Sequence, residues 1–246
     1  MKVLAIGNSF SQDATRYLHD LARAEHEKIE VINLYIGGCS LERHYRNMLG
    51  DKADYQLECN GHQTGFFVSI KEALLSREWD VITLQQASPL SPKAATYEPY
   101  LSELAAYVRR MQPHAKLVIH QTWAYEEGSH RLLEIAGYPT PQSMMADVKQ
   151  AYEIAAKHVC ANGIIPSGEL FAKLCSSGIP KVHRDTFHAS LGLGRYALGL
   201  LWYRCLLGKS VADHAFCPLD EPISDRELAI VKACVDSFDP IDFHTV

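Results

Sequence analysis

Short apolar runs alternate with longer amphipathic stretches along most of this chain, and this alternation constrains the fold more than any other feature. It is typical of a parallel β-sheet whose two faces are covered by helices. The candidate strands are Lys2–Ile6, Glu30–Leu34, Asp80–Leu84, Lys116–His120 and Gly163–Pro166. The candidate helices are Asp13–Glu25, Ser69–Arg77, Pro99–Met111, Gln142–Val159, Ala189–Leu207 and Asp225–Phe238. The pattern predicts a three-layer α/β/α sandwich with a parallel sheet of about five strands.

Three connections are longer than such a fold needs. Residues 55–68 contain Asn60-Gly61, a pair that suits the tight turn of a β-hairpin, so we expect a small hairpin there. Residues 87–98 and 125–141 are expected to be loops, because both contain prolines and the second also contains glycines. Both loops leave the carboxyl end of a predicted strand, where open α/β sheets place their ligand sites. Without an internal repeat, low-complexity tract or linker, residues 1–246 are expected to form a single domain.

Composition narrows the partners and the compartment. A net charge of −5 and the lack of a basic run argue against nucleic acid as a partner. No apolar stretch approaches the roughly 20 residues of a membrane span, so no membrane association is expected. A strand beginning at Lys2 leaves no room for a signal peptide, although a leader removed earlier stays open. Seven cysteines without a Cys-x-x-Cys pair favour reduced thiols and a cytoplasmic setting over disulfides or a zinc site. The composition favours no particular oligomeric state.

Gly7, Asn8 and Ser9 follow the first predicted strand and place a serine on a sharp turn. The glycine lets the backbone bend there. A serine hydroxyl at this position can attack a carbonyl carbon once a neighbouring imidazole takes its proton. It can also satisfy the backbone N–H groups at the start of the following helix. This segment alone leaves both uses open.

Asp185 and His188 form the strongest chemical signal in the chain. Their spacing of three residues puts both side chains on one face of a helical turn. An imidazole activates a serine best when a carboxylate fixes its tautomer, so Ser9, His188 and Asp185 are a candidate triad. Two alternatives stay open. His183, Asp185 and His188 could instead form the metal site of a metal-dependent hydrolase, and Asp185 could simply cap a helix.

Two other segments offer hydrogen-bond donors for an oxyanion. Gly37 and Gly38 follow the second predicted strand, where a glycine backbone N–H can approach a ligand without a side chain in the way. Gln85 and Gln86 end the third strand, and a side-chain amide there could complete an oxyanion hole. The alternatives are an ordinary glycine turn and amides that bind loop backbone.

Two aromatic residues, Trp123 and Tyr125, follow the fourth predicted strand on the same edge of the sheet. Aromatic rings at a ligand site can serve as a platform on which a sugar stacks. They can equally pack into the core. Both are candidate substrate-binding residues.

The order of these segments resembles the SGNH (GDSL-type) serine hydrolases. Members of that family carry a serine after the first strand, a glycine after the second, an asparagine after the third and Asp-x-x-His near the C-terminus. The corresponding segments here are residues 7–11, 33–38, Gln85-Gln86 and Asp185 to His188. The resemblance implies a flavodoxin-like three-layer fold, no cofactor, and hydrolysis of a short-chain acyl ester, for example an acetyl group on a carbohydrate.

The same resemblance implies roles for individual residues. Ser9 is the nucleophile, His188 the general base and Asp185 its orienting carboxylate, while Ser9 N–H and Gly38 N–H form the oxyanion hole. The chain departs from the family in having Asn8 where the family has aspartate, and in lacking the Gly-x-Asn-Asp block.

In the place of that block stand Gln85 and Gln86, and we prefer Gln86 as the third oxyanion donor. The resulting interpretation is a serine esterase acting on a small-molecule or carbohydrate ester. Two alternatives remain: a non-catalytic carbohydrate- or nucleotide-binding α/β domain whose serine turn holds an anion, and the metal-dependent hydrolase.

Overall fold

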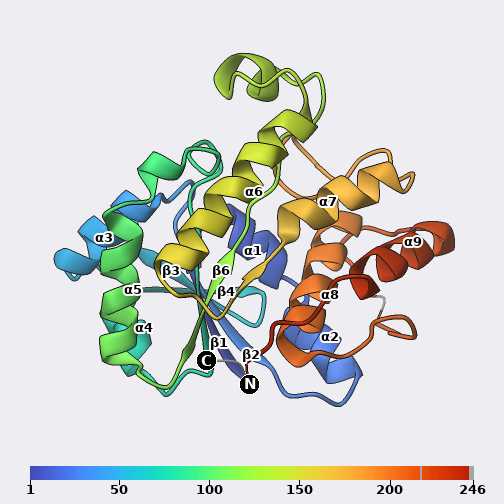
Figure 1. The fold of residues 1–246 in the computed structure, drawn as a ribbon. Helices are drawn as coiled ribbons and strands as arrows, with labels where there is room; N and C mark the ends of the chain where they lie inside the picture. Colours follow the sequence, from blue (N-terminus) through green and yellow to red (C-terminus); the bar gives the residue numbers. More distant parts are fainter. Residues whose placement is uncertain (217, 244–246) are drawn as a thin grey trace.

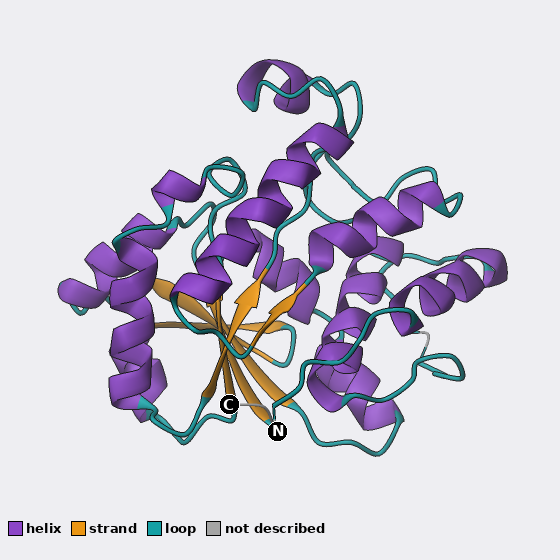
Figure 2. Ribbon diagram, viewed as in Figure 1, coloured by secondary structure: helices purple, strands orange, loops and turns teal. Residues whose placement is uncertain are grey.

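A seven-stranded sheet runs through the centre of the computed structural model, which describes residues 1–216 and 218–243. The strands are β1 (Lys2–Gly7), β2 (Glu30–Tyr35), β3 (Tyr55–Cys59), β4 (His62–Val68), β5 (Val81–Leu84), β6 (Lys116–His120) and β7 (Gly163–Ile165). Their order across the sheet is β4-β3-β2-β1-β5-β6-β7. Helices flank the strands on both sides (Figure 2), which confirms the predicted α/β/α architecture.

The five parallel strands lie where the sequence predicts them, each within one residue at either end. β1 sits at the centre and pairs in parallel with β2 and β5, so that Ile6 lies between Leu34 and Leu84. Strands β1, β2 and β5 are apolar and buried along nearly their whole length, because helices cover both faces of the sheet. This register brings the carboxyl ends of the three central strands to one edge of the sheet.

The sheet has seven strands rather than the predicted five because the expected hairpin joins it. β3 pairs antiparallel with β2, and β4 pairs antiparallel with β3 at the outer edge. The turn forms at Asn60 and Gly61, both with positive φ, as the Asn-Gly pair predicts. β4 is mostly exposed, with Phe66 and Phe67 facing solvent. The β4 sequence therefore lacks the alternation of buried and exposed residues that would predict the hairpin as part of the sheet.

The helices of the described residues are α1 (Ser9–Thr15), α2 (Leu18–Ala24), α3 (Leu41–Leu49), α4 (Ile70–Leu75), α5 (Tyr100–Met111), α6 (Pro141–His158), α7 (Ser167–Ser176), α8 (Leu193–Leu207) and α9 (Asp225–Asp236). Helix α8 packs against α1, α2, α7 and α9, while α3, α4 and α5 pack against one another. Figure 1 shows these two groups on opposite sides of the strands, with α6 crossing in front. None of the helices in the described part of the chain is long and apolar enough to span a membrane.

Several predicted helix boundaries are wrong. The helix predicted at Asp13–Glu25 is two helices, and the first begins earlier, at Ser9. Helix α8 begins at Leu193, because Ala189 pairs with His183 in an isolated β-bridge instead. Helices α3 and α7 were not predicted. The fully buried positions of α3 are Leu41, His44 and Asn47, two of them polar, although Leu41, Tyr45 and Met48 do stand at helical spacing against the core.

The two predicted loops contain short helical turns. A 3₁₀ turn, Ala94–Thr96, lies in the first, and a π-helical turn, Arg131–Ile135, lies in the second. In Figure 1 the second appears as the yellow-green coil above α6. The six cysteines within the described residues are free thiols, and Cys217 lies outside them.

Candidate active site

Ser9 is the first residue of α1, directly beyond the carboxyl end of β1. Asn8 caps the helix: its Oδ1 accepts the Phe10 N–H at 3.0 Å, and its own N–H donates to Ser11 Oγ at 3.0 Å. Because Ser9 opens the helix, its N–H has no acceptor within that helix. Gly7 has to be a glycine, since a Cβ there would lie 2.4 Å from Ser11 Oγ. The serine hydroxyl therefore stands at the tip of a fixed strand-to-helix turn.

His188 and Asp185 approach this serine from the other end of the chain. His188 Nε2 lies 2.9 Å from Ser9 Oγ, and His188 Nδ1 lies 2.8 Å from Asp185 Oδ2. A carboxylate can only accept, so the proton of neutral His188 sits on Nδ1 and Nε2 accepts from the serine hydroxyl. Asp185 Oδ1 also accepts the His188 backbone N–H at 2.9 Å. Burial raises the pKa of Asp185, but the hydrogen bonds from His188 outweigh it and the net pKa is lowered.

The segment that carries Asp185 and His188 is not the helical turn that their spacing predicts. Residues 184–188 form a bend closed by the Arg184 N–H, which donates to the His188 carbonyl at 3.0 Å. Thr186 adopts a positive φ of 74° within this bend. This closing bond runs opposite to that of a helical turn, and the bend still brings the carboxylate and the imidazole together, because Asp185 Oδ1 accepts the His188 backbone N–H.

Three contacts from two distant segments, the loop after β6 and helix α1, hold this bend in place. Trp123 Nε1 donates to the Phe187 carbonyl at 2.7 Å, and the Glu126 N–H donates to the Thr186 carbonyl at 2.8 Å. The third contact comes from α1, four residues beyond Ser9.

That contact is made by Asp13, a fully buried carboxylate. Its oxygens accept from Arg184 Nη1 at 2.9 Å, from Arg195 Nε at 2.8 Å and from the Ala189 N–H at 3.1 Å. Asp13 thus ties the helix that begins at Ser9 to both ends of the bend that bears His188. Sequence reasoning did not assign Asp13 to the site, because its partners lie 171 to 182 positions away along the chain.

A cavity of about 320 Å³ opens at this point. It is lined by Asn8, Ser9, Phe10, Tyr35, Gly37, Gly38, Ser88, Pro89, Arg131, Phe187 and His188. Gly38 has a φ of +62°, a conformation that suits glycine. Asn8 Nδ2 donates to the Cys39 carbonyl at 3.1 Å and so joins the glycine loop to the serine turn. Ser9 and Gly38, whose N–H groups are expected to form the oxyanion hole, therefore border one cavity.

Neither Gln85 nor Gln86 borders this cavity, and both expected donor roles are wrong. Gln86 Nε2 donates to the Thr96 carbonyl at 3.1 Å, while its Oε1 accepts the Leu41 and Ala87 N–H groups at 3.0 and 2.9 Å. The amide is buried and binds mainly backbone, with one further bond to the Thr96 hydroxyl at 3.2 Å, which agrees with the open alternative.

Gln85 instead supports the serine turn from below. Its Nε2 donates to Asn8 Oδ1 at 2.9 Å, and its Oε1 accepts from His120 Nδ1 at 2.8 Å. Since that oxygen can only accept, His120 carries its proton on Nδ1, and its Nε2 accepts from Ser167 Oγ at 3.0 Å. Burial lowers the pKa of His120 to about 3, so the ring is neutral in this network.

Trp123 and Tyr125 are not a platform for a sugar, because both side chains are buried. Trp123 stacks on Phe10 with ring centroids 4.0 Å apart, and the Tyr125 hydroxyl lies 3.0 Å from Ser88 Oγ. Both aromatics pack beneath the candidate site. Arg131, which does border the cavity, was not predicted; its position on the loop that leaves β6 was the one available signal.

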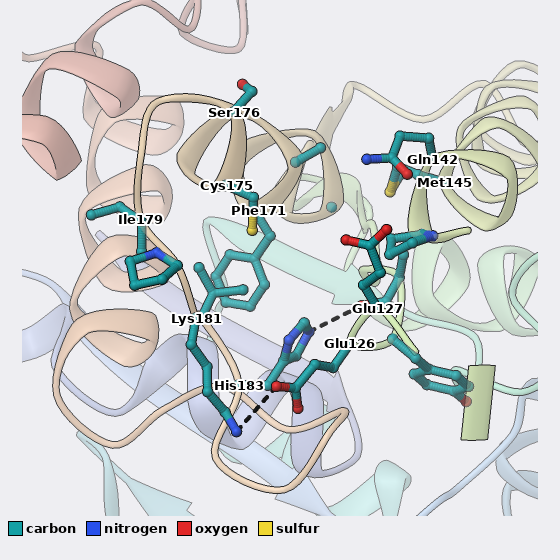
Figure 3. Close-up of a pocket in the computed structure, with 17 residues that line it drawn as sticks. Glu126, Glu127, Gln142, Met145, Phe171, Cys175, Ser176, Ile179, Lys181 and His183 are labelled. Atoms are coloured by element: carbon teal, nitrogen blue, oxygen red, sulfur yellow. Dashed lines mark hydrogen bonds and ion pairs between the residues drawn. The ribbon is translucent and has the colours of Figure 1, made fainter. Parts of the chain in front are cut away.

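The metal site proposed for His183, Asp185 and His188 is not formed. His183 Nε2 lies 3.0 Å from the Ala124 carbonyl oxygen, and His183 lines a separate cavity of about 440 Å³ that neither Asp185 nor His188 borders (Figure 3). Burial lowers the pKa of His183 to about 4. Lys181 and Glu126, which also line that cavity, form an ion pair at 3.1 Å (Figure 3). Within the described residues no three His, Cys, Asp or Glu side chains are grouped to hold an ion.

Comparison with known proteins places this fold among relatives of two kinds. A crystal structure of a DUF4886 family protein from Bacteroides uniformis is 34% identical, with a TM-score of 0.88 over 96% of this chain and 93% of that one. A candidate SGNH hydrolase from Slackia heliotrinireducens is 21% identical, with a TM-score of 0.59 over 82% of this chain and 96% of that one. The acetylxylan esterase Axe2 from Geobacillus stearothermophilus is 14% identical, with a TM-score of 0.52 over 82% and 92%.

The two hydrolase structures share the fold with this chain. No curated protein matches the sequence. The family model described as a domain of unknown function (DUF4886) matches residues 2–237. Since that match spans nearly the whole sequence, the chain belongs to the DUF4886 family.

Proposed function

We propose that this protein is a serine hydrolase that cleaves carboxylic esters with Ser9, His188 and Asp185. The observation that carries the proposal is the continuous pair of hydrogen bonds from carboxylate to imidazole to hydroxyl, at 2.8 and 2.9 Å. This is the arrangement that a hydroxyl needs to become a nucleophile. The fold shared with hydrolases and an esterase adds independent support.

In the proposed mechanism, His188 Nε2 takes the proton of Ser9 Oγ as this oxygen attacks the ester carbonyl. Asp185 keeps the second imidazole proton on Nδ1 and stabilises the imidazolium that forms. The imidazolium then protonates the leaving alcohol, which departs and leaves an acyl group on Ser9. A water molecule, deprotonated by the same imidazole, attacks this acyl-enzyme and releases the acid.

The tetrahedral intermediate carries a negative oxygen that needs donors. We assign this role to the N–H groups of Ser9 and Gly38, which border the same cavity. The Asn8 side chain supports them, because it bonds both the amide of Phe10 and the carbonyl of Cys39. With both glutamines bound elsewhere, these two backbone groups are the donors of the proposal.

The cavity suits a short acyl group. Its volume of about 320 Å³ lies at the lower end of the range for small-molecule pockets. An acetyl ester is therefore the first substrate to test, and the acetylxylan esterase among the structures of similar fold agrees with that choice.

The test is hydrolysis of p-nitrophenyl acetate by the parent protein and by two serine variants. Ser9→Ala is expected to abolish turnover while the melting temperature stays nearly unchanged. Ser88→Ala removes the other serine of the cavity and is expected to keep turnover, because its hydroxyl is bonded to Tyr125 rather than to an imidazole. Activity above a few per cent in Ser9→Ala would contradict the proposal. No turnover in the parent with any ester would favour a non-catalytic binding domain.

A further inference from the structure

Arg131 borders the same cavity as Ser9 and His188, on the π-helical turn of the loop after β6. Its guanidinium carbon lies 3.7 Å from the centroid of the Phe187 ring. The Phe187 ring in turn lies 3.8 Å from the His188 ring, centroid to centroid. One aromatic ring therefore separates the positive charge from the catalytic imidazole of the proposed mechanism.

The charge of Arg131 is not balanced by an acid of this chain. The acid on the same turn, Glu134, lies 3.3 Å from His130 instead. None of the residues that border the cavity is Asp or Glu. The ion pairs of the described residues leave no carboxylate within 4.0 Å of Arg131.

Other arginines around the site differ in this respect. Arg184 and Arg195 both bind the buried Asp13, and Arg16 binds Asp220 at 2.7 Å. The Asp185 carboxylate does not border the cavity, and its oxygens accept from His188 Nδ1 and from the His188 backbone N–H, at 2.8 and 2.9 Å. Arg131 is thus a fixed positive charge in a cavity whose other polar groups are hydroxyls, amides and an imidazole.

The way Arg131 is held leaves part of its edge available. A guanidinium has five N–H donors in one plane; stacking on Phe187 occupies the face of that plane, and the Tyr125 hydroxyl engages one donor at its edge, which leaves the other donors for a ligand. The side chain is half-buried, so solvent competes less strongly for these donors than at an open surface. A planar fork of donors matches a carboxylate in a two-point contact.

We infer that Arg131 selects esters that bear a carboxylate next to the ester bond. This inference rests on the proposed function, because it assigns the substrate class of the same site. The carboxylate can belong to the acyl group, as in a half-ester of a dicarboxylic acid, or to the alcohol, as in an acetylated uronic acid. Both place a carboxylate one short spacer away from the carbonyl that Ser9 attacks.

The test compares two matched pairs of esters. The acyl-side pair is 4-nitrophenyl hemisuccinate and its neutral methyl ester, and the alcohol-side pair is 4-acetoxybenzoate and 4-acetoxybenzamide. The parent protein is expected to prefer the charged member of one pair by about 10- to 100-fold in kcat/KM, the scale of a charge-assisted hydrogen bond. The pair that shows the preference identifies which part of the substrate carries the carboxylate.

Variants attribute the preference to Arg131. Arg131→Gln is expected to lower kcat/KM for the charged ester only, so that the two members of the pair differ by no more than about threefold. Arg131→Glu is expected to reverse the preference, so that the neutral ester is hydrolysed faster. Arg110→Gln is the matched control, because Arg110 also stacks on an aromatic ring, Tyr107 at 5.1 Å, but borders neither cavity described above. It is expected to leave the preference unchanged.

Two results would overturn the inference while leaving the proposed function intact. One is Ser9-dependent hydrolysis that does not distinguish charged from neutral esters in either pair. The other is an Arg131→Gln variant that loses the same factor on both members, which would make Arg131 a packing residue on Phe187. Hydrolysis that survives Ser9→Ala overturns the proposed function, and this inference with it.

Discussion

Gln85 Nε2 donates a hydrogen bond of 2.9 Å to Asn8 Oδ1, and so ties the end of β5 to the residue that precedes Ser9. Through the other atoms of its side chain, Asn8 also holds the glycine loop at the Cys39 carbonyl. Gln85, the polar residue after the third parallel strand, thus holds the serine turn through Asn8. It does not reach the cavity itself.

Gln85→Ala is expected to lower kcat by about 10- to 100-fold, the scale on which small misplacements of reacting groups reduce rates, with KM within threefold of the parent. It also leaves the buried Nδ1–H of His120 without its acceptor, which costs about 1–3 kcal/mol of unfolding free energy. Steady-state kinetics and urea unfolding measure the two effects separately. A change in KM alone would mean that Gln85 contributes to binding rather than to the geometry of the turn.

Gln86→Ala is expected to show the opposite pattern. Its side chain binds the backbone of Leu41, Ala87 and Thr96, so its loss is expected to cost a few kcal/mol of unfolding free energy, at about 1–3 kcal/mol for each group left unsatisfied. We expect kcat per folded molecule to stay within about threefold of the parent, because no oxyanion donor is removed. A loss of kcat near 10³-fold with unchanged stability would restore the original assignment.

Asp13→Asn is expected to destabilise the protein strongly, because it removes the charge that two half-buried arginines share. Breaking a buried ion pair from one side costs about 3–5 kcal/mol. Asp220→Asn is the matched control: Asp220 binds the same Arg195 at 3.2 Å, but its side chain is 32% exposed. Asp220→Asn is expected to lower the free energy of unfolding by no more than about 1 kcal/mol. Equal losses in urea unfolding would show that Asp13 has no special role in joining α1 to the bend.

The buried ring of His120 predicts a dependence of stability on pH. Its pKa is about 3 in the folded state against 6.5 for a free histidine. Above pH 6.5 the ring is neutral in both states and the free energy of unfolding is at its full value. As the pH falls from 6.5 towards 3, only the unfolded chain takes up a proton on this ring, so the free energy of unfolding decreases. The slope is about 1.4 kcal/mol per pH unit in this window.

His120→Gln is expected to remove that share of the slope. His114→Gln, at an exposed histidine, is expected to keep it. Urea unfolding at several pH values between 4 and 7 measures both, and identical slopes in the parent and His120→Gln would contradict the assignment.

The parallel sheet could be predicted from the sequence because its strands are buried on both faces and read as continuous apolar runs. The hairpin strand β4 could not be placed in the same way, since its exposed positions break the pattern. Helix α3 carried a readable period in Leu41, Tyr45 and Met48, which pack against the core. Helix α7 did carry a readable signal, with Leu170, Phe171 and Leu174 buried at helical spacing.

The residues expected to react are brought together, and Gly38 borders the same cavity, while Gln85, Gln86, Trp123 and Tyr125 do not border it. Ser9, Asp185 and His188 are predictable because each stands in a short local motif. The roles of Gln85, Asp13 and Arg131 depend on partners far away in sequence, which no local spacing records. Trp123 and Tyr125 were assigned by position along a strand, but position does not reveal which face of the loop a ring packs against.

The triad variants are expected to differ in size of effect. His188→Ala removes the base and is expected to lower kcat/KM by about 10⁶-fold, whereas Asp185→Asn is expected to cost about 10⁴-fold. Asparagine can still bond the imidazole but favours the wrong tautomer and cannot stabilise the imidazolium. Equal activity in Asp185→Asn and the parent would remove Asp185 from the mechanism.

The central claim is that Ser9 is a nucleophile activated by His188, and covalent labelling tests it without knowledge of the substrate. The protein is treated with a serine-directed organophosphonate, and the modified peptide is identified by mass spectrometry. We predict one adduct per chain, on Ser9, absent in Ser9→Ala and formed far more slowly in His188→Ala. An adduct on another residue, or no adduct on the folded parent protein, would contradict the account.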